Sequence, residues 1–156
     1  MEYGPEKILP YNNEEQKSTQ VRRMFDSIAG TYDLLNHALS FGIDKGWRKK
    51  GISFLKPYAP SEVLDIATGT GDLAISIYKM LAPNKIIGAD ISEGMIAKAN
   101  AALEKFEVQN ARILKAELES LPLRDDSIHL VISNCTINHA SDKPAVWGEV
   151  YRILKS

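Results

Sequence analysis

Short apolar runs alternate with segments of helical hydrophobic spacing from residue 62 to the end of the printed chain. The apolar runs are rich in β-branched residues and predict strands at 62–67, 85–90, 111–116 and 128–133. The segments between and after them predict helices at 72–82, 92–106 and 143–154. This alternation is typical of an α/β fold with a parallel sheet and right-handed crossovers, in the order 3-2-1-4. A ligand site is expected at the carboxyl ends of strands one and four, where the strand order reverses.

The first 60 residues have a different pattern. Gly4, Pro5 and Pro10 predict an extended arm over residues 1–12, and helical spacing then begins. Asn13 is the expected helix cap, with Gln16 completing a capping box, and the helix ends at Gly30. Shorter helices are expected at 32–39 and 44–55, before Pro57 and Pro60. We therefore expect one domain overall, with an N-terminal arm and helical lid at 1–60 and a cofactor-binding core at 61–156.

Length, composition and charge exclude several classes of protein. The 156 residues fit a single core, and 44% hydrophobic and 25% charged residues are ordinary for a globular protein. A net charge of −1 gives no sign of a nucleic-acid partner. No apolar run is long enough to span a bilayer, and the first residues do not resemble a secretory signal. One cysteine, Cys135, excludes an internal disulfide and a cysteine-rich zinc site. We expect a cytoplasmic protein without a metal.

The glycine-rich turn after the first strand is the strongest sign of a binding site. Gly69, Gly71 and Ala74 satisfy the G-x-G-x-x-G/A spacing of nucleotide-type cofactor sites. The spacing alone is weak, since glycine pairs also mark ordinary strand-to-helix turns. Here it lies between a strand and a helix, and Asp90 closes the next strand nineteen residues after Gly71. The whole unit therefore predicts a cofactor site.

Acidic residues around this turn indicate which type of cofactor it would bind. A dinucleotide would place its pyrophosphate at the helix N-terminus, but Asp72 occupies that position and Asp65 ends the strand below it. These acids favour a cationic ligand without phosphate, such as S-adenosylmethionine, and disfavour a nicotinamide dinucleotide. Asp90 is expected to accept hydrogen bonds from ribose hydroxyls, or else to cap the next helix, which Ser92 could do equally well. Asp65 either contacts the ligand ammonium or holds loop amides.

Residues 21–95 resemble the quinone C-methyltransferases of menaquinone and ubiquinone biosynthesis. The phrase M-F-D-x-I-A-x-x-Y-D-x-L-N is far more specific than the glycine turn. It begins at Met24, and the other matching segments are 39–42, 47–50, 63–73 and 88–95. The resemblance implies a Rossmann-like class I methyltransferase. It implies binding of S-adenosylmethionine and methylation of a ring carbon of a demethylated quinol bearing a polyprenyl tail.

The resemblance also assigns site residues. Thr70, Asp90 and the adjoining Ile91 fall on cofactor-binding positions, and Asn134 aligns with another. The segment Ala116–Pro122 is similar to the family's adenine-binding segment, with Glu117 in place of Asp or Asn and Leu118 in place of Ala. Tyr32 lies in a segment that would close over the cofactor. The expected cofactor-binding residues are Tyr32, Asp65, Gly69, Thr70, Gly71, Asp90, Ile91, Glu117, Leu118 and Asn134.

The second half of the chain departs from the family's sequence motifs. After strand four the family usually reads F-G-x-R-N, whereas residues 134–143 read N-C-T-I-N-H-A-S-D-K, closer to arsenite-type and other small-molecule methyltransferases. The chain could be a composite of two related halves. Such folds usually continue for three more strands, so the printed chain reads as truncated, with those strands missing. Strand four would then be an exposed edge, from which we expect homo-oligomers, strand swapping or poor solubility.

The acceptor side is less defined. His139 follows strand four and is the candidate base for deprotonating a ring hydroxyl, although a loop histidine without a task is the alternative. Cys135 lacks the companion thiol that an arsenic site needs. A basic set could touch anionic lipid head groups at the site entrance, or form solvated helix faces: Arg22, Arg23, Arg48, Lys49 and Lys50.

The sequence therefore predicts an S-adenosylmethionine-dependent methyltransferase acting on a demethylated quinol, with peripheral membrane contact as an additional expectation. Two alternatives stay open. One is a methyltransferase acting on another small molecule, and the other is a catalytically silent cofactor-binding fragment.

Overall fold

The computed structural model describes residues 10–11, 15–31, 43–134 and 136–155. Four sequence expectations fall outside these ranges. They are the arm before residue 10, the cap at Asn13, the helix at 32–39 with Tyr32, and the single cysteine at position 135.

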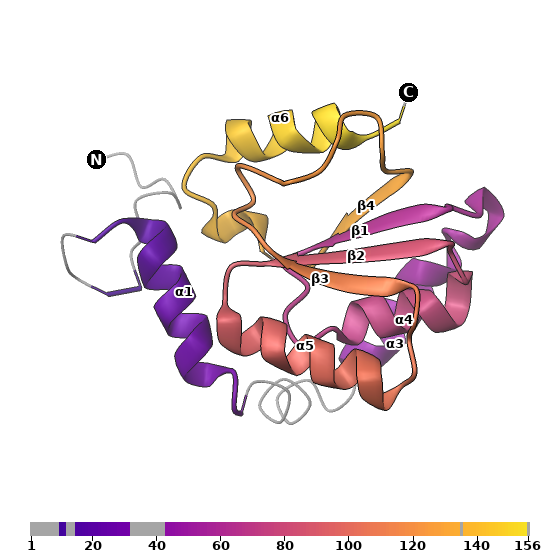
Figure 1. Cartoon of the computed structure of the whole chain (residues 1–156), viewed down its shortest axis with the longest axis horizontal. Coiled ribbons are helices and arrows are strands. Elements are labelled where there is room, and N and C mark those ends of the chain that lie inside the picture. Colours follow the sequence, from indigo (N-terminus) through magenta and orange to yellow (C-terminus); the bar gives the residue numbers. More distant parts are fainter. Residues whose placement is uncertain (1–9, 12–14, 32–42, 135, 156) are drawn as a thin grey trace.

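A four-stranded parallel sheet forms the centre of the molecule (Figure 1). Its strands are β1 (Glu62–Ile66), β2 (Lys85–Asp90), β3 (Ala111–Lys115) and β4 (Leu130–Ser133). Their spatial order is β3-β2-β1-β4, which confirms the predicted order. The fourth strand starts two residues later than expected, because Ile128 makes only an isolated bridge to Leu154.

Helices cover both faces of the sheet. On one face lie α3 (Ile43–Ser53), α4 (Asp72–Leu81) and α5 (Glu93–Lys105), and on the other lies α6 (Lys143–Ile153) (Figure 1). The helix α1 (Lys17–Ile28) stands beside the carboxyl ends of the strands. Two short 3-10 helices, η2 (Lys56–Tyr58) and η3 (Ile137–His139), complete the described elements.

The side chains of each strand alternate between the two faces of the sheet, and this alternation produces two hydrophobic layers. Successive side chains of a strand point to opposite faces, and here both faces are covered. Leu64 and Ile87 pack with Ile153 in the layer of α6. Val63 and Ile86 pack in the layer of α3 and α4. Helix α3 contributes Ile52 to this second layer, so it forms part of the core beside the sheet.

The start of α1 differs from the predicted capping box at Asn13. The helix begins at Lys17, and Gln16 stands at its N-cap without a side-chain hydrogen bond. Gln20 ties this end of the helix instead. It is fully buried, its amide donates to the Glu15 carbonyl at 2.8 Å, and its carbonyl oxygen accepts from the Tyr11 amide at 2.9 Å. A buried glutamine side chain thus holds the segment before the helix where a cap was expected.

Candidate functional site

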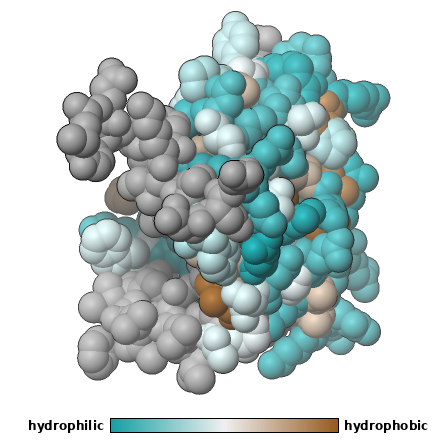
Figure 2. Space-filling view, turned by 90° about the vertical axis from the view of Figure 1, so that its left-hand side faces the viewer, coloured by the Kyte–Doolittle hydropathy of each residue, from teal (hydrophilic) through white to brown (hydrophobic). Residues whose placement is uncertain are grey.

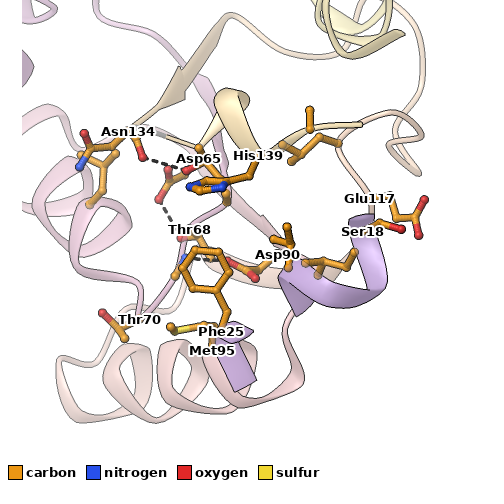
Figure 3. A pocket seen from close by; sticks show the side chains of 18 of the residues that line it. Ser18, Phe25, Asp65, Thr68, Thr70, Asp90, Met95, Glu117, Asn134 and His139 are labelled. Carbon is orange, nitrogen blue, oxygen red and sulfur yellow. Dashed lines mark hydrogen bonds between the residues drawn. The ribbon is translucent and has the colours of Figure 1, made fainter. Parts of the chain in front are cut away.

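A cavity opens at the carboxyl ends of β1, β2 and β4, where the strand order reverses. It encloses about 1130 Å³ of empty space, a volume that includes the solvent at its open mouth. Its walls come from α1, α3, the turn after β1, the end of β2 and the loops after β3 and β4 (Figure 3). It brings together most of the residues singled out in the sequence: Asp65, Gly69, Thr70, Asp90, Ile91, Glu117, Leu118, Asn134 and His139.

Two predicted site residues are not among those that line the cavity. Tyr32 lies outside the described residues, and Gly71 is not one of the lining residues. Gly71 caps α4 with φ +84°, and a Cβ there would lie 3.2 Å from Ala99 of α5. This backbone conformation and the closeness of α5 both favour glycine at this position. Gly69, with φ +58°, does line the cavity.

Asp90 holds the glycine turn. Its side-chain oxygens accept from the amides of Gly69 and Ser92, each at 2.9 Å. The residue is only 6% exposed, and burial raises the pKa of its carboxyl against the lowering effect of these amides. Ser92, rather than Asp90, caps α5, because its hydroxyl accepts from the Met95 amide at 3.1 Å. Asp90 therefore ties the turn to the end of β2 and faces the cavity.

Asp65 is the most deeply buried acid of the site, with 1% of its surface exposed. The pKa of its carboxyl is raised to about 7, mainly by desolvation and in smaller part by the nearby charge of Asp90. The Thr68 hydroxyl, which donates to it at 2.7 Å, and the positive charge of Arg48 act in the opposite direction. Because this carboxyl lines the cavity, a cation bound beside it would favour its ionised form.

Arg48 was named from the sequence only as part of the basic set at the site entrance, and not as a residue of the cofactor site. It lines the cavity from α3, and its guanidinium forms an ion pair of 3.0 Å with Asp72. The ion pair offsets the negative charge that Asp72 was expected to place at the helix N-terminus, so the acidity of this site comes from Asp65 and Asp90. A signal was present, because Arg48 lies one helical turn before the buried Ile52 and shares its inward face.

Helix α1 supplies a wall of the cavity through Ser18, Val21 and Phe25. The Phe25 ring meets the imidazole of His139 edge to face, with centroids 5.9 Å apart and an interplanar angle of 88° (Figure 3). Two apolar residues of this helix, Val21 and Phe25, therefore line the cavity and do more than pack against other helices.

The segment after β3 forms the rim. Glu117 is exposed, and Figure 3 shows its carboxylate turned away from Asp90. Glu119 was not predicted, although it lines the cavity and its carboxylate accepts from the amides of Ser141 and Asp142 at 2.9 and 3.2 Å. It thereby joins the segment after β3 to the loop that carries His139.

Of the five basic residues proposed for the entrance, Arg48 is the one that lines the cavity. Arg23 pairs with Glu15 on the surface. Figure 2 shows the face that carries α1, which is mostly hydrophilic where its residues are described. Within the described part of the chain, no helix is long and apolar enough to cross a membrane, and no group of metal-binding side chains is found.

The sequence pattern of the ubiE/COQ5 methyltransferase family matches residues 13–156 of this chain. The chain belongs to the ubiE/COQ5 methyltransferase family. This membership confirms the resemblance found in residues 21–95, and the match extends through the loop after β4.

Curated relatives carry names from quinone biosynthesis. The demethylmenaquinone methyltransferase of Bacteroides fragilis is 41% identical over 157 residues, which cover 100% of this chain and 64% of that protein. The ubiquinone/menaquinone biosynthesis C-methyltransferase of Geobacter sulfurreducens is 35% identical over 96% of this chain and 59% of its own length. The chain thus spans about three fifths of the length of these relatives.

Solved structures support the fold class. A SAM-dependent methyltransferase from Aquifex aeolicus superposes with a TM-score of 0.58 at 27% sequence identity, covering 61% of this chain and 51% of that one. The expected Rossmann-like class I methyltransferase fold is confirmed by this likeness together with the strand order.

Proposed function

We propose that this protein binds S-adenosylmethionine and transfers its methyl group to a ring carbon of a demethylated quinol. The observation that carries the proposal is the presence of two buried carboxyls, Asp65 and Asp90, on one cavity with the Gly69 turn. Membership of the family and the names of the relatives support the same reaction. The small-molecule acceptor is the quinol.

The residues of the cavity fit this cofactor. When bound, S-adenosylmethionine supplies an electrophilic methyl group on a positively charged sulfonium. Each Asp90 oxygen uses one lone pair on a backbone amide and keeps another for a ribose hydroxyl. Asp65 provides negative charge for the cofactor ammonium, and Arg48 provides positive charge for its carboxylate. Glu117 and Leu118 stand where an adenine would reach the rim, and Thr70, Ile91 and Asn134 complete the lining.

The acceptor side is formed by α1 and the loop after β4. His139 takes the proton of the ring hydroxyl, which increases electron density at the neighbouring carbon. Phe25 and Val21 shield this side from water, and aligning the two reactants in a closed cavity supplies most of the rate enhancement. The contact of His139 with Phe25 at the cavity wall supports this role.

Peripheral membrane contact is a further part of the proposal. Three aromatic residues are exposed here, Trp47 in α3, Phe54 just after it and Tyr58 in η2, and Lys49 and Lys50 of α3 are exposed as well. Aromatic and basic side chains together suit the interface of an anionic lipid surface, which a polyprenyl substrate would occupy. The protein would then act in the cytoplasm beside the membrane.

Calorimetry tests the cofactor assignment. We expect S-adenosylhomocysteine, but not NAD, to bind the chain. Asp90→Asn should weaken that binding about tenfold or more, because the amide nitrogen cannot accept the hydrogen bonds that one carboxylate oxygen receives. Glu93→Gln is the matched control, since Glu93 is an exposed acid three residues away. Binding of NAD in place of the adenosyl compound would overturn the assignment.

A methyl-transfer assay with demethylmenaquinol tests the reaction. The protein of full family length is the right sample, compared with its His139→Gln variant. We expect kcat to fall about a hundredfold or more while the affinity for S-adenosylhomocysteine is retained, because general base catalysis contributes on this scale. Unchanged turnover in the variant would remove His139 from the reaction.

A further inference from the structure

Two segments that carry the family resemblance contact each other across the structure. Asp26, from the M-F-D phrase on α1, accepts at its Oδ1 a hydrogen bond of 2.6 Å from the Ser92 hydroxyl. The same oxygen accepts from the Gly94 amide at 3.1 Å. Asp26 is exposed and is not among the residues that line the cavity, so the proposed chemistry leaves its place in the phrase unexplained.

Close packing accompanies these hydrogen bonds. A Cβ on Gly94 would lie 3.1 Å from the Ala29 Cβ and 3.5 Å from the Asp26 carboxylate. The end of α1 thus approaches the start of α5 at a distance that glycine allows. One turn further along α5, the Lys98 ammonium donates to the Gly30 carbonyl at 3.1 Å. Helix α1 is therefore anchored along the first turns of α5.

The anchor continues into the cofactor side of the cavity. The Ser92 hydroxyl donates to Asp26, and the Ser92 amide donates to Asp90 at 2.9 Å. Asp90 in turn accepts from the Gly69 amide at 2.9 Å. Hydrogen bonds thus run without a break from α1 through Ser92 and Asp90 to the glycine turn.

The other side of α1 faces the acceptor loop. Phe25, next to Asp26 in the sequence, packs on His139, and the Lys17 ammonium donates to the Ala140 carbonyl at 3.5 Å. Adjacent residues of one helix therefore contact both sides of the site: Asp26 accepts from Ser92 on the cofactor side, and Phe25 packs on His139 on the acceptor side.

We propose that Asp26 is a positioning residue, which holds α1 against the Asp90 segment so that Phe25 and Val21 close the cavity over the bound cofactor. This inference rests on the proposed function. When the anchor is lost, α1 covers the cavity for a smaller fraction of the time, and the apparent affinity for an adenosyl ligand falls by that fraction.

Binding of S-adenosylhomocysteine to three variants of α1 tests the anchor. Asp26→Ala removes the acceptor, and we expect about tenfold weaker binding, the effect of losing one charge-assisted hydrogen bond. Asp26→Asn keeps an Oδ1 acceptor for Ser92 and Gly94, so its affinity should stay within about threefold of the unchanged protein. Ser27→Ala is the matched control, because the Ser27 hydroxyl donates to the Met24 carbonyl of its own helix and the residue is exposed.

Hydrogen exchange of the ligand-free chain gives a readout that is independent of the cofactor. We expect amides of residues 17–28 to exchange faster in Asp26→Ala, and also in Gly94→Ala, which pushes against Ala29. Exchange in β1 and β2 should be unchanged. If the unchanged protein fails to bind S-adenosylhomocysteine, the proposed function is wrong, and the exchange result still decides whether the anchor exists.

Three results would overturn the inference. The first is Asp26→Ala binding as tightly as the unchanged protein. The second is equal weakening by Asp26→Asn, because that would assign the effect to the charge of Asp26, which acts on the pKa of Asp90. The third is weakened binding of Asp26→Ala without faster exchange in α1.

Discussion

The hydroxyl of Thr68 donates a 2.7 Å hydrogen bond to the carboxyl of Asp65, a residue with 1% of its surface exposed. This bond supports the ionised form, but burial outweighs it and raises the pKa of Asp65 from 3.8 to about 7. Between these two values the folded chain binds a proton that the unfolded chain has released. The free energy of unfolding therefore falls as pH rises through this window.

We predict that Asp65→Asn removes this pH dependence. Between pH 5 and pH 8 the variant should gain about 2 to 3 kcal/mol relative to the unchanged protein, since each pKa unit corresponds to about 1.4 kcal/mol. Denaturant unfolding at both pH values measures the difference. Glu104→Gln, an exposed carboxyl on α5, is the control and should show no such gain. Parallel pH profiles for Asp65→Asn and the unchanged protein would show that Asp65 does not titrate in this range.

Gly71 and Gly148 should respond in opposite directions to substitution by alanine. Gly71 has φ +84°, and a Cβ there would lie 3.2 Å from Ala99, so Gly71→Ala should destabilise the chain by about 1 to 3 kcal/mol. Gly148 lies inside α6 with open space around it, and Gly148→Ala should stabilise by about 0.5 to 1 kcal/mol through helix propensity. Urea unfolding of the two variants checks both signs. A stable Gly71→Ala variant would contradict the turn geometry.

The guanidinium of Arg152 organises the segment before β4. It donates to the carbonyls of Leu121 and Leu123 at 3.0 and 2.7 Å, to Asp125, and to both oxygens of Glu149. A lysine cannot reproduce this fork, so Arg152→Lys should lower the free energy of unfolding by about 1 to 2 kcal/mol. Arg112→Lys on the exposed side of β3 serves as the control. Equal stability of the two variants would show that the fork adds little.

The sequence was sufficient for the sheet and for most of the cavity. Strand order followed from alternating apolar runs, and a parallel sheet then brings the ends of its strands to one edge. That is why Asp65, Asp90 and His139, far apart in the chain, could be placed at one site before any coordinates.

The sequence was insufficient wherever a contact depends on how one element docks on another. Arg48 reaches the cavity because α3 packs beside α4, and Glu119 joins two loops whose approach no local pattern encodes. The start of α1 was misplaced for the same reason, since the buried Gln20 depends on the segment that folds over it. The spacing rule also does not tell which glycine of the turn lines the cavity, and here Gly69 does.

Gly88 has a consequence for the history of this chain. A methyl group there would lie 2.7 Å from the Ile113 Cδ1 and 2.9 Å from the Thr68 Cγ2, although it would be the smallest side chain that could be added. Serine at position 68 would remove that methyl branch, and the remaining neighbours would be the flexible tip of Ile113 and the Cβ of residue 68 at 3.0 Å. We therefore expect positions 68 and 88 to vary together among proteins that share an ancestor with this chain. Alanine at position 88 should occur mainly where position 68 carries a side chain smaller than threonine.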